Sequence, residues 1–256
     1  MARAFAHEWI LFRLACQMLT RFPAARGIDY APALDAAAVR YYPAAGILVG
    51  LAGGAVFAAA FSPFGPSPAA VLAIAASVLL TGAMHEDGLA DTADGIGGGQ
   101  SAERALEIMR DSRIGVYGVL ALVLVIVAKA FALATLSPWL GLAVLVAAHG
   151  LSRWSVVLVI ATARYVRPSG TASPVAGAVS PVSHVIAAVT AVACLLLAGY
   201  AASPQAAAGL LVGLACGHVA VRAAYQAKLK GYTGDCLGAT QQVSELGAYL
   251  GLLACL

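Results

Sequence analysis

Long apolar stretches alternate with short polar segments along most of the chain. Stretches with few or no charged residues cover residues 43–61, 69–84, 114–136, 139–163, 182–202, 205–225 and about 238–256. A transmembrane helix needs roughly 20 residues, so each stretch has about the length of one span. The pattern therefore predicts an all-α fold, a polytopic integral membrane helical bundle with about seven transmembrane helices.

The N-terminal apolar segment has a different pattern. Residues 5–22 are largely apolar, but His7, Glu8, Arg13 and Arg21 interrupt the run. Interruptions of this kind fit an amphipathic helix lying at the membrane surface better than a helix that crosses it. We therefore expect an N-terminal interfacial helix in addition to the transmembrane bundle.

The overall composition agrees with a membrane protein. Hydrophobic residues make up 61% of the chain and charged residues 11%, and the mean hydropathy is +0.88, whereas about a quarter of the residues in a soluble protein are charged. We expect one membrane-embedded domain over residues 1–256, with residues 1–42 as its cytoplasmic or interfacial N-terminal segment. The expected partners include the lipid bilayer and no nucleic acid, and the sequence leaves open whether the chain forms a homo-oligomer.

A few residues stand out within the apolar stretches. Lys129 and Arg153 lie deep within predicted spans, where a charge is costly and marks a functional candidate. We expect Arg153 to face the bundle interior, towards the acidic stretch described below or towards a structural partner. The polar turns around Glu245, in the last span, must lie at the interface or inside the bundle. Gly46 and Gly50 suit close helix packing in lipid.

The charges of the connecting segments predict the orientation of the bundle. The connections at residues 62–68, 137–138 and 203–204 contain no charged residue. The alternate connections are basic and hold Arg104, Arg110, Arg113, Arg164, Arg167, Lys228 and Lys230. By the positive-inside rule these basic connections and the N-terminus face the cytoplasm.

An acidic stretch on that predicted cytoplasmic face carries the first candidate chemistry. Glu86, Asp87, Asp91 and Asp94 follow one another closely, and no Lys or Arg occurs between Tyr41 and Glu103. In a helix the three aspartates stand at i, i+4 and i+7 and share one face, where like charges repel. Mg²⁺ would reverse that repulsion, since it is commonly held by a few carboxylates and substrate phosphates. We therefore predict a magnesium site, with a solvated acidic turn as the alternative.

Two further polar segments lie on the same predicted face. Arg110, Asp111 and Arg113 place two guanidinium groups beside a carboxylate, which suits phosphate binding or an Arg–Asp surface pair. In the loop 228–242, Asp235 precedes an apolar helix. It could cap that helix or supply one more oxygen ligand to the predicted metal.

Three segments carry a resemblance to a known family. HEDGLADTADG (85–95), EIMRDSRIG (107–115) and GYTGDCLGA (231–239) resemble the signature segments of cobalamin synthase, the adenosylcobinamide-GDP ribazoletransferase family, and they occur in that family's order. Glu86 departs from the pattern, which usually has Leu there. Glu86 could therefore add a metal ligand or face water.

The resemblance implies a reaction and a location. The family joins adenosylcobinamide-GDP to α-ribazole or its 5′-phosphate and releases GMP, with Mg²⁺, at a late step of cobalamin biosynthesis. This implies a multi-pass protein of the bacterial inner membrane with its active site facing the cytoplasm. Phosphoryl transfer between two anionic substrates is a task for metal ions held by carboxylates.

We accordingly assign roles to the candidate residues. The predicted metal ligands are Asp87, Asp91, Asp94 and Glu86. The predicted catalytic carboxylates, as ligands or as the base for the hydroxyl, are Asp87, Asp91, Asp111 and Asp235. The predicted phosphate-binding residues are Arg110, Arg113, Lys228, Lys230 and Arg153. The alternatives are a cation-coupled membrane transporter, which would carry acids near the bilayer midplane, and an enzyme like the CDP-alcohol phosphotransferases.

Overall fold

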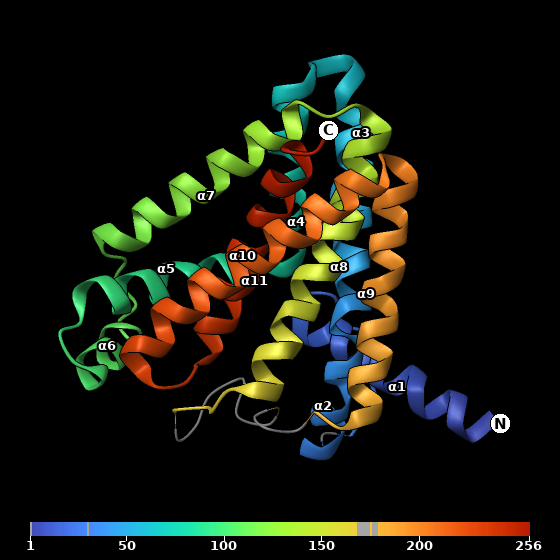
Figure 1. The fold of residues 1–256 in the computed structure, drawn as a ribbon. Helices are drawn as coiled ribbons and strands as arrows, with labels where there is room; N and C mark the ends of the chain where they lie inside the picture. The colour runs from blue at the N-terminus through green and yellow to red at the C-terminus, as the bar shows by residue number, and fades with distance from the viewer. Residues whose placement is uncertain (1, 30, 168–174, 176–178) are drawn as a thin grey trace.

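The structure, a computed structural model, consists of helices and their connections (Figure 1). It describes all residues except 1, 30, 168–174 and 176–178. The elements, in chain order, are α1 (Ala2–Leu19), α2 (Pro32–Ala38), the 3₁₀ turn η1 (Val39–Tyr41), α3 (Tyr42–Phe64), α4 (Pro66–Thr81), α5 (Met84–Gly98), α6 (Ala102–Ile108), α7 (Val116–Ala134), α8 (Pro138–Thr162), α9 (Pro181–Ala201), α10 (Pro204–Leu229) and α11 (Gly234–Leu253). Among the described residues the only β pairing is an isolated bridge between Tyr165 and Tyr232. The prediction of an all-α fold is confirmed.

Five segments are long and apolar enough to cross a membrane. They are the continuous stretch Pro32–Phe64 and the helices α7, α8, α9 and α10, and a sixth results if α4 and α5 are counted as one bent pair. The two other predicted spans are helices too, but α4 has only 16 residues and α11 carries several polar side chains. The protein is a multi-pass membrane protein, and the predicted number of about seven spans is approximate.

The chain turns sharply between α4 and α5. The two helices are bent by 91° relative to each other, and α5 lies outside the five spans. Gly82 and Ala83, at the turn, have φ angles of +69° and +61°, in the left-handed region that ends helices. The acidic stretch therefore does not continue the direction of α4, and it leads sideways from the centre of the bundle towards α6 (Figure 1).

Glycines allow the central helices to approach closely. A Cβ atom added at Gly50 of α3 would lie 2.5 Å from the carbonyl oxygen of Leu145 in α8. In the same way Gly213 of α10 faces the backbone of Gly247 in α11. Small residues at such contacts bring backbones together in lipid, as predicted for α3.

The N-terminal helix packs on one side and is exposed on the other. Leu11, Ala15 and Leu19 of α1 are buried, whereas Phe5 and Trp9 are exposed. Exposed aromatic residues on a helix that also has polar positions are typical of an interfacial helix. A helix was expected over residues 5–22, and the observed helix covers Ala2–Leu19, so it ends three residues earlier.

Candidate active site

Asp87, Asp91 and Asp235 come together where α5 meets α11. Asp87 is exposed and Asp91 is half-buried one turn further along α5, while Asp235 lies in the first turn of α11. The two helices touch through their backbones, since a Cβ atom added at Gly88 would lie 2.7 Å from the carbonyl oxygen of Asp235. We call Asp87, Asp91 and Asp235 the face carboxylates. Their grouping brings together the two polar segments that the sequence places on one side of the membrane.

The face carboxylates influence one another electrostatically. Burial, followed by the neighbouring charges of Asp87 and Asp235, raises the pKa of Asp91 to about 7. Burial also raises the pKa of Asp235, although Arg167 opposes this shift. A carboxyl group that is costly to ionise near other carboxylates gains from a cation. Such shifted pKa values are typical of functional sites.

Among the residues that the structure describes, Arg167 is the basic side chain that forms an ion pair with a face carboxylate. Its Nη2 lies 2.7 Å from Oδ2 of Asp235. The bridge between Tyr165 and Tyr232 positions it, because the Val166 amide donates to the Tyr232 carbonyl at 3.0 Å. Sequence reasoning counted Arg167 only as a loop charge, since nothing in the local pattern shows which distant acid it meets.

Thr233, and not Asp235, caps α11. The Thr233 hydroxyl accepts a hydrogen bond from the Cys236 amide at 3.4 Å. The interpretation of Asp235 as the helix cap is therefore wrong. Its carboxylate instead meets Arg167 and the Thr233 hydroxyl.

Asp94 has a different position from the other two aspartates of α5. It is buried, and its two carboxylate oxygens accept hydrogen bonds from the amides of Gly115 at 2.7 Å and Gly118 at 2.8 Å. These amides belong to the start of α7, where a negative charge is favourable. Asp94 therefore fastens the beginning of α7 to α5 and has its oxygens occupied there.

The predicted phosphate-binding residues of the connecting segments differ in their partners. Asp111 and Arg113 form an exposed pair, with Nη2 and Oδ2 2.6 Å apart, and the pKa of Asp111 falls to about 2 because Arg113 donates hydrogen bonds to it. The sequence allowed either phosphate binding or an Arg–Asp surface pair here, and the structure has the surface pair. Lys228 donates to the carbonyl of Gly99 at 2.5 Å, at the end of α5. Arg110 and Lys230 are exposed.

Comparison with known proteins identifies the family. Residues 11–253 match the model of a family described as cobalamin-5-phosphate synthase. This chain belongs to that family. It is 40% identical to a protein of Polaromonas sp. over 97% of this chain and 96% of the relative. It is 43% identical to a protein of Leptothrix cholodnii over 98% and 97%, and 42% identical to one of Bradyrhizobium diazoefficiens over 91% and 89%.

All three relatives are named adenosylcobinamide-GDP ribazoletransferase. The cobalamin-5-phosphate synthase family is thus an enzyme family, and the resemblance seen in the three sequence segments is confirmed. No solved structure matches the chain.

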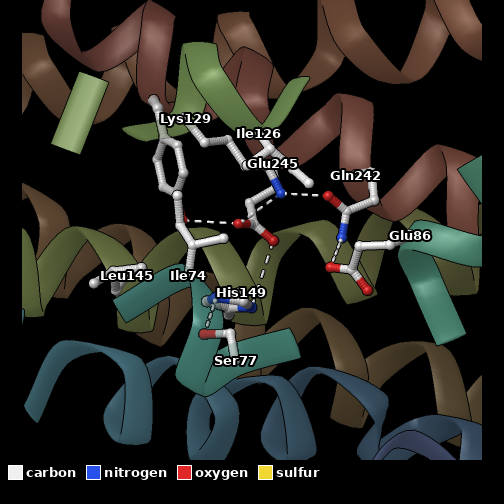
Figure 2. A pocket seen from close by; sticks show the side chains of 10 residues that line it. Ile74, Ser77, Glu86, Ile126, Lys129, Leu145, His149, Gln242 and Glu245 are labelled. Atoms are coloured by element: carbon white, nitrogen blue, oxygen red, sulfur yellow. Dashed lines mark hydrogen bonds and ion pairs between the residues drawn. The ribbon is translucent and has the colours of Figure 1, made fainter. Parts of the chain in front are cut away.

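A second polar group of the chain lies inside the bundle (Figure 2). We call it the interior cluster, and it consists of Glu86, Lys129, His149, Arg153, Gln241, Gln242, Glu245 and Tyr249. Lys129 and Glu245 are 4% and 3% exposed, and their Nζ and Oε1 atoms lie 3.0 Å apart. The polar turns of α11 are therefore inside the bundle, which is one of the two places that the sequence allowed.

Two predicted site residues belong to the interior cluster. Arg153 is 1% exposed, and its Nη1 lies 3.0 Å from Nδ1 of His149, so it faces the interior and lies apart from the exposed Arg110 and Lys230. Glu86 accepts a hydrogen bond from Gln242 at 2.8 Å. It points away from Asp87, because adjacent residues of a helix do not share a face.

The face carboxylates fit Mg²⁺ as part of a shared site. The described residues contain no group of three or more His, Cys, Asp or Glu side chains spaced to hold a metal by themselves. Mg²⁺ is usually held by one or two carboxylates together with substrate phosphates and water. Asp87 and Asp91, one helical turn apart and with mutually unfavourable charges, match that requirement.

Proposed function

We propose that this chain joins adenosylcobinamide-GDP to α-ribazole or α-ribazole 5′-phosphate, releasing GMP and forming adenosylcobalamin or its 5′-phosphate. Its relatives, similar over nearly their whole length, are named adenosylcobinamide-GDP ribazoletransferase. The observation that carries the proposal is the meeting of Asp87, Asp91 and Asp235 from two separate segments. Membership of an enzyme family favours this reaction over the transporter.

In this proposal Asp87 and Asp91 hold Mg²⁺. When bound there, Mg²⁺ supplies positive charge that stabilises the entering and leaving oxygens of a transferred phosphoryl group. Asp94 and Glu86 are left out, because the first caps α7 and the second belongs to the interior cluster. Asp111 is left out as well, because Arg113 already occupies its oxygens.

The remaining residues bind and orient the substrates. Asp235, with a pKa raised by burial, takes the proton of the attacking ribose hydroxyl. The new bond joins that ribose oxygen to the phosphorus attached to cobinamide, the pyrophosphate bond breaks, and GMP leaves. Lys228, Lys230 and Arg110 lie at the same face and receive phosphate groups. The same proposal places this face in the cytoplasm, at the bacterial inner membrane.

An assay of purified protein tests the reaction and the metal together. Protein in detergent is incubated with adenosylcobinamide-GDP and each acceptor, with and without Mg²⁺, and GMP release is followed. Asp87→Asn should abolish GMP release, because a neutral amide no longer offers Mg²⁺ a negatively charged oxygen ligand. Circular dichroism should show the same helix content as the unmodified protein.

Asp29→Asn is the matched control, since Asp29 is an exposed acid outside the α5–α11 contact. It should leave the rate unchanged. Full Mg²⁺-dependent GMP release by the Asp87→Asn variant would remove the metal assignment. Absence of GMP release from the unmodified protein with either acceptor would remove the proposed reaction.

A further inference from the structure

The interior cluster begins next to the face carboxylates. Glu86 directly precedes Asp87 on α5, and Nε2 of Gln242 on α11 donates to its Oε1 at 2.8 Å. Lys129 of α7 donates to Oε1 of the same Gln242 at 2.6 Å. A continuous series of bonds therefore runs from α5 through α11 to α7 (Figure 2).

The far end of this series is firmly anchored. Glu245 pairs with Lys129 at 3.0 Å and with the His149 ring at 3.4 Å, and it accepts a hydrogen bond from the Tyr249 hydroxyl at 2.8 Å. Glu245 is also bonded by Gln241. Charges buried in this way are held by their partners, because leaving one unpaired in the interior is very costly.

The interior cluster is too confined to bind a substrate. Six of its eight side chains, all except Arg153 and Gln241, help to line a cavity of about 20 Å³, which is on the scale of a single water molecule. A nucleotide or a corrinoid has no room there. These side chains therefore affect the site through the positions of the helices that carry them.

The contact between α5 and α11 needs side-chain bonds that hold the two helices in one position. At Gly88 and Gly238 the two backbones touch without side chains, since a Cβ atom added at Gly238 would lie 3.0 Å from the carbonyl oxygen of His85. Glycines permit a close approach, but they have no side chain that fixes one helix against another. The bond between Glu86 and Gln242 supplies a fixed point one residue away from Asp87.

That fixed point depends on a single hydrogen bond. The second oxygen of Glu86, Oε2, is buried without a hydrogen-bond partner among the described residues. Gln242 is therefore the partner on which the orientation of the Glu86 carboxylate rests. Without it, both oxygens of a partly buried carboxylate would lack a partner, and α5 would shift to bring that group to water.

From these observations we infer that Glu86 and Gln242 are positioning residues, which hold α5 against α11 so that Asp87 and Asp91 keep their place beside Asp235. The inference rests on the proposed function, because it assigns the metal site to Asp87 and Asp91. It gives the interior cluster a role in cation affinity, although none of its members touches the cation. Partners of this kind typically change metal affinity by about 10- to 100-fold.

Mn²⁺ binding to the purified protein, followed by electron paramagnetic resonance in detergent, tests the inference without substrate. Gln242→Leu should weaken Mn²⁺ binding about tenfold. Gln242→Glu should weaken it as well, because two carboxylates then face each other. The double variant E86Q/Q242E should restore binding, since Gln at 86 can donate to Glu at 242 and the charge of the cluster is unchanged.

Two further variants separate positioning from other roles. Glu86→Gln alone keeps the acceptor oxygen and should keep Mn²⁺ affinity, whereas a direct metal ligand at 86 would lose it. Ser155→Ala is the matched control, because it removes a hydrogen bond of 2.7 Å to His218, between α8 and α10, and leaves α5 untouched. It should not change Mn²⁺ affinity.

The outcomes distinguish this inference from the proposed function. Unchanged affinity in Gln242→Leu and Gln242→Glu, with binding still lost in Asp87→Asn, would overturn the positioning role and keep the metal site. Failure of E86Q/Q242E to restore binding in a folded protein would overturn it too. If Gln242→Leu does not fold, the charge-swap series decides. Binding that survives Asp87→Asn would overturn the metal site and, with it, this inference.

Discussion

At the scale of single residues, the face carboxylates differ in how their negative charge is compensated. Asp235 has the guanidinium of Arg167 at 2.7 Å, whereas Asp91, whose pKa is raised to about 7, has Asp87 as its principal charged neighbour. A compensated carboxylate keeps its orientation, and an uncompensated one favours a cation. This difference is why we assign the proton-accepting role to Asp235 and the metal to the pair on α5.

Loss of Arg167 should show most directly how the compensation of Asp235 affects stability and activity. Arg167→Ala leaves Asp235 facing other carboxylates and removes the hydrogen bond to the Met109 carbonyl. We expect a lower melting temperature, corresponding to about 1–3 kcal/mol for a buried group left without its partner, and a loss of GMP release. Thermal unfolding in detergent and the release assay measure the two effects.

Arg164→Ala is the control, since the structure uses the Arg164 backbone carbonyl, and not its side chain, in the bridge to Tyr232. It should retain both stability and activity. An Arg167→Ala protein as stable and as active as the unmodified one would contradict the role given to this ion pair.

At the scale of elements, the distance between α5 and α11 determines the site. The helices approach so closely at Gly88 that an added methyl group would overlap the backbone of Asp235. Backbone atoms do not yield as a flexible side chain does. The geometry of the face carboxylates is therefore a property of this helix pair and of the side chains that lock it.

Gly88→Ala tests whether the close approach of α5 and α11 determines the geometry of the face carboxylates. We expect it to separate Asp87 from Asp235 and to reduce the rate of GMP release strongly, with a destabilisation of about 1–3 kcal/mol from overpacking. Activity assays and thermal unfolding together give the comparison. Gly98→Ala is the matched substitution on the same helix, where the new methyl group would meet only Ile108 at 3.4 Å, and it should behave like the unmodified protein. Equal activity of the two variants would contradict the expectation.

At the scale of the whole molecule, the basic connections lie at one side of the bundle, and the uncharged connections lie at the other (Figure 1). The positive-inside rule predicts that the basic side is cytoplasmic. Both substrates and the nucleotide product would then be exchanged with the cytoplasm.

Labelling of single cysteines tests the orientation. In a chain with Cys216 and Cys255 replaced by serine, a cysteine at Ser112 should react with a membrane-impermeant maleimide only after the cells are opened. A cysteine at Ser67, in an uncharged connection, should react in intact cells. Both positions are exposed, so accessibility alone does not separate them. The reverse pattern would place the basic connections outside the cytoplasm.

Much of this molecule could be predicted from periodicity and charge, because both are local properties. The apolar stretches predicted the helices, and the two polar segments that were expected on one face do meet, at the contact between α5 and α11. The partners of Asp94 and Arg167 could not be predicted, since both depend on contacts between distant segments. The exclusion of Glu86 from the group formed by Asp87 and Asp91 could have been predicted from the sequence, because adjacent residues of a helix do not share a face.

The pairing of Lys129 with Glu245 has a consequence for the insertion of the helices into the membrane. Ribosomes synthesise α7 well before α11, so the lysine enters the bilayer while its acidic partner does not yet exist. Until then its long side chain must reach towards the headgroups. Pairing of Glu245 with Lys129 in the finished bundle then removes the cost of both buried charges at once, so we expect α11 to insert stably only where α7 is already in place.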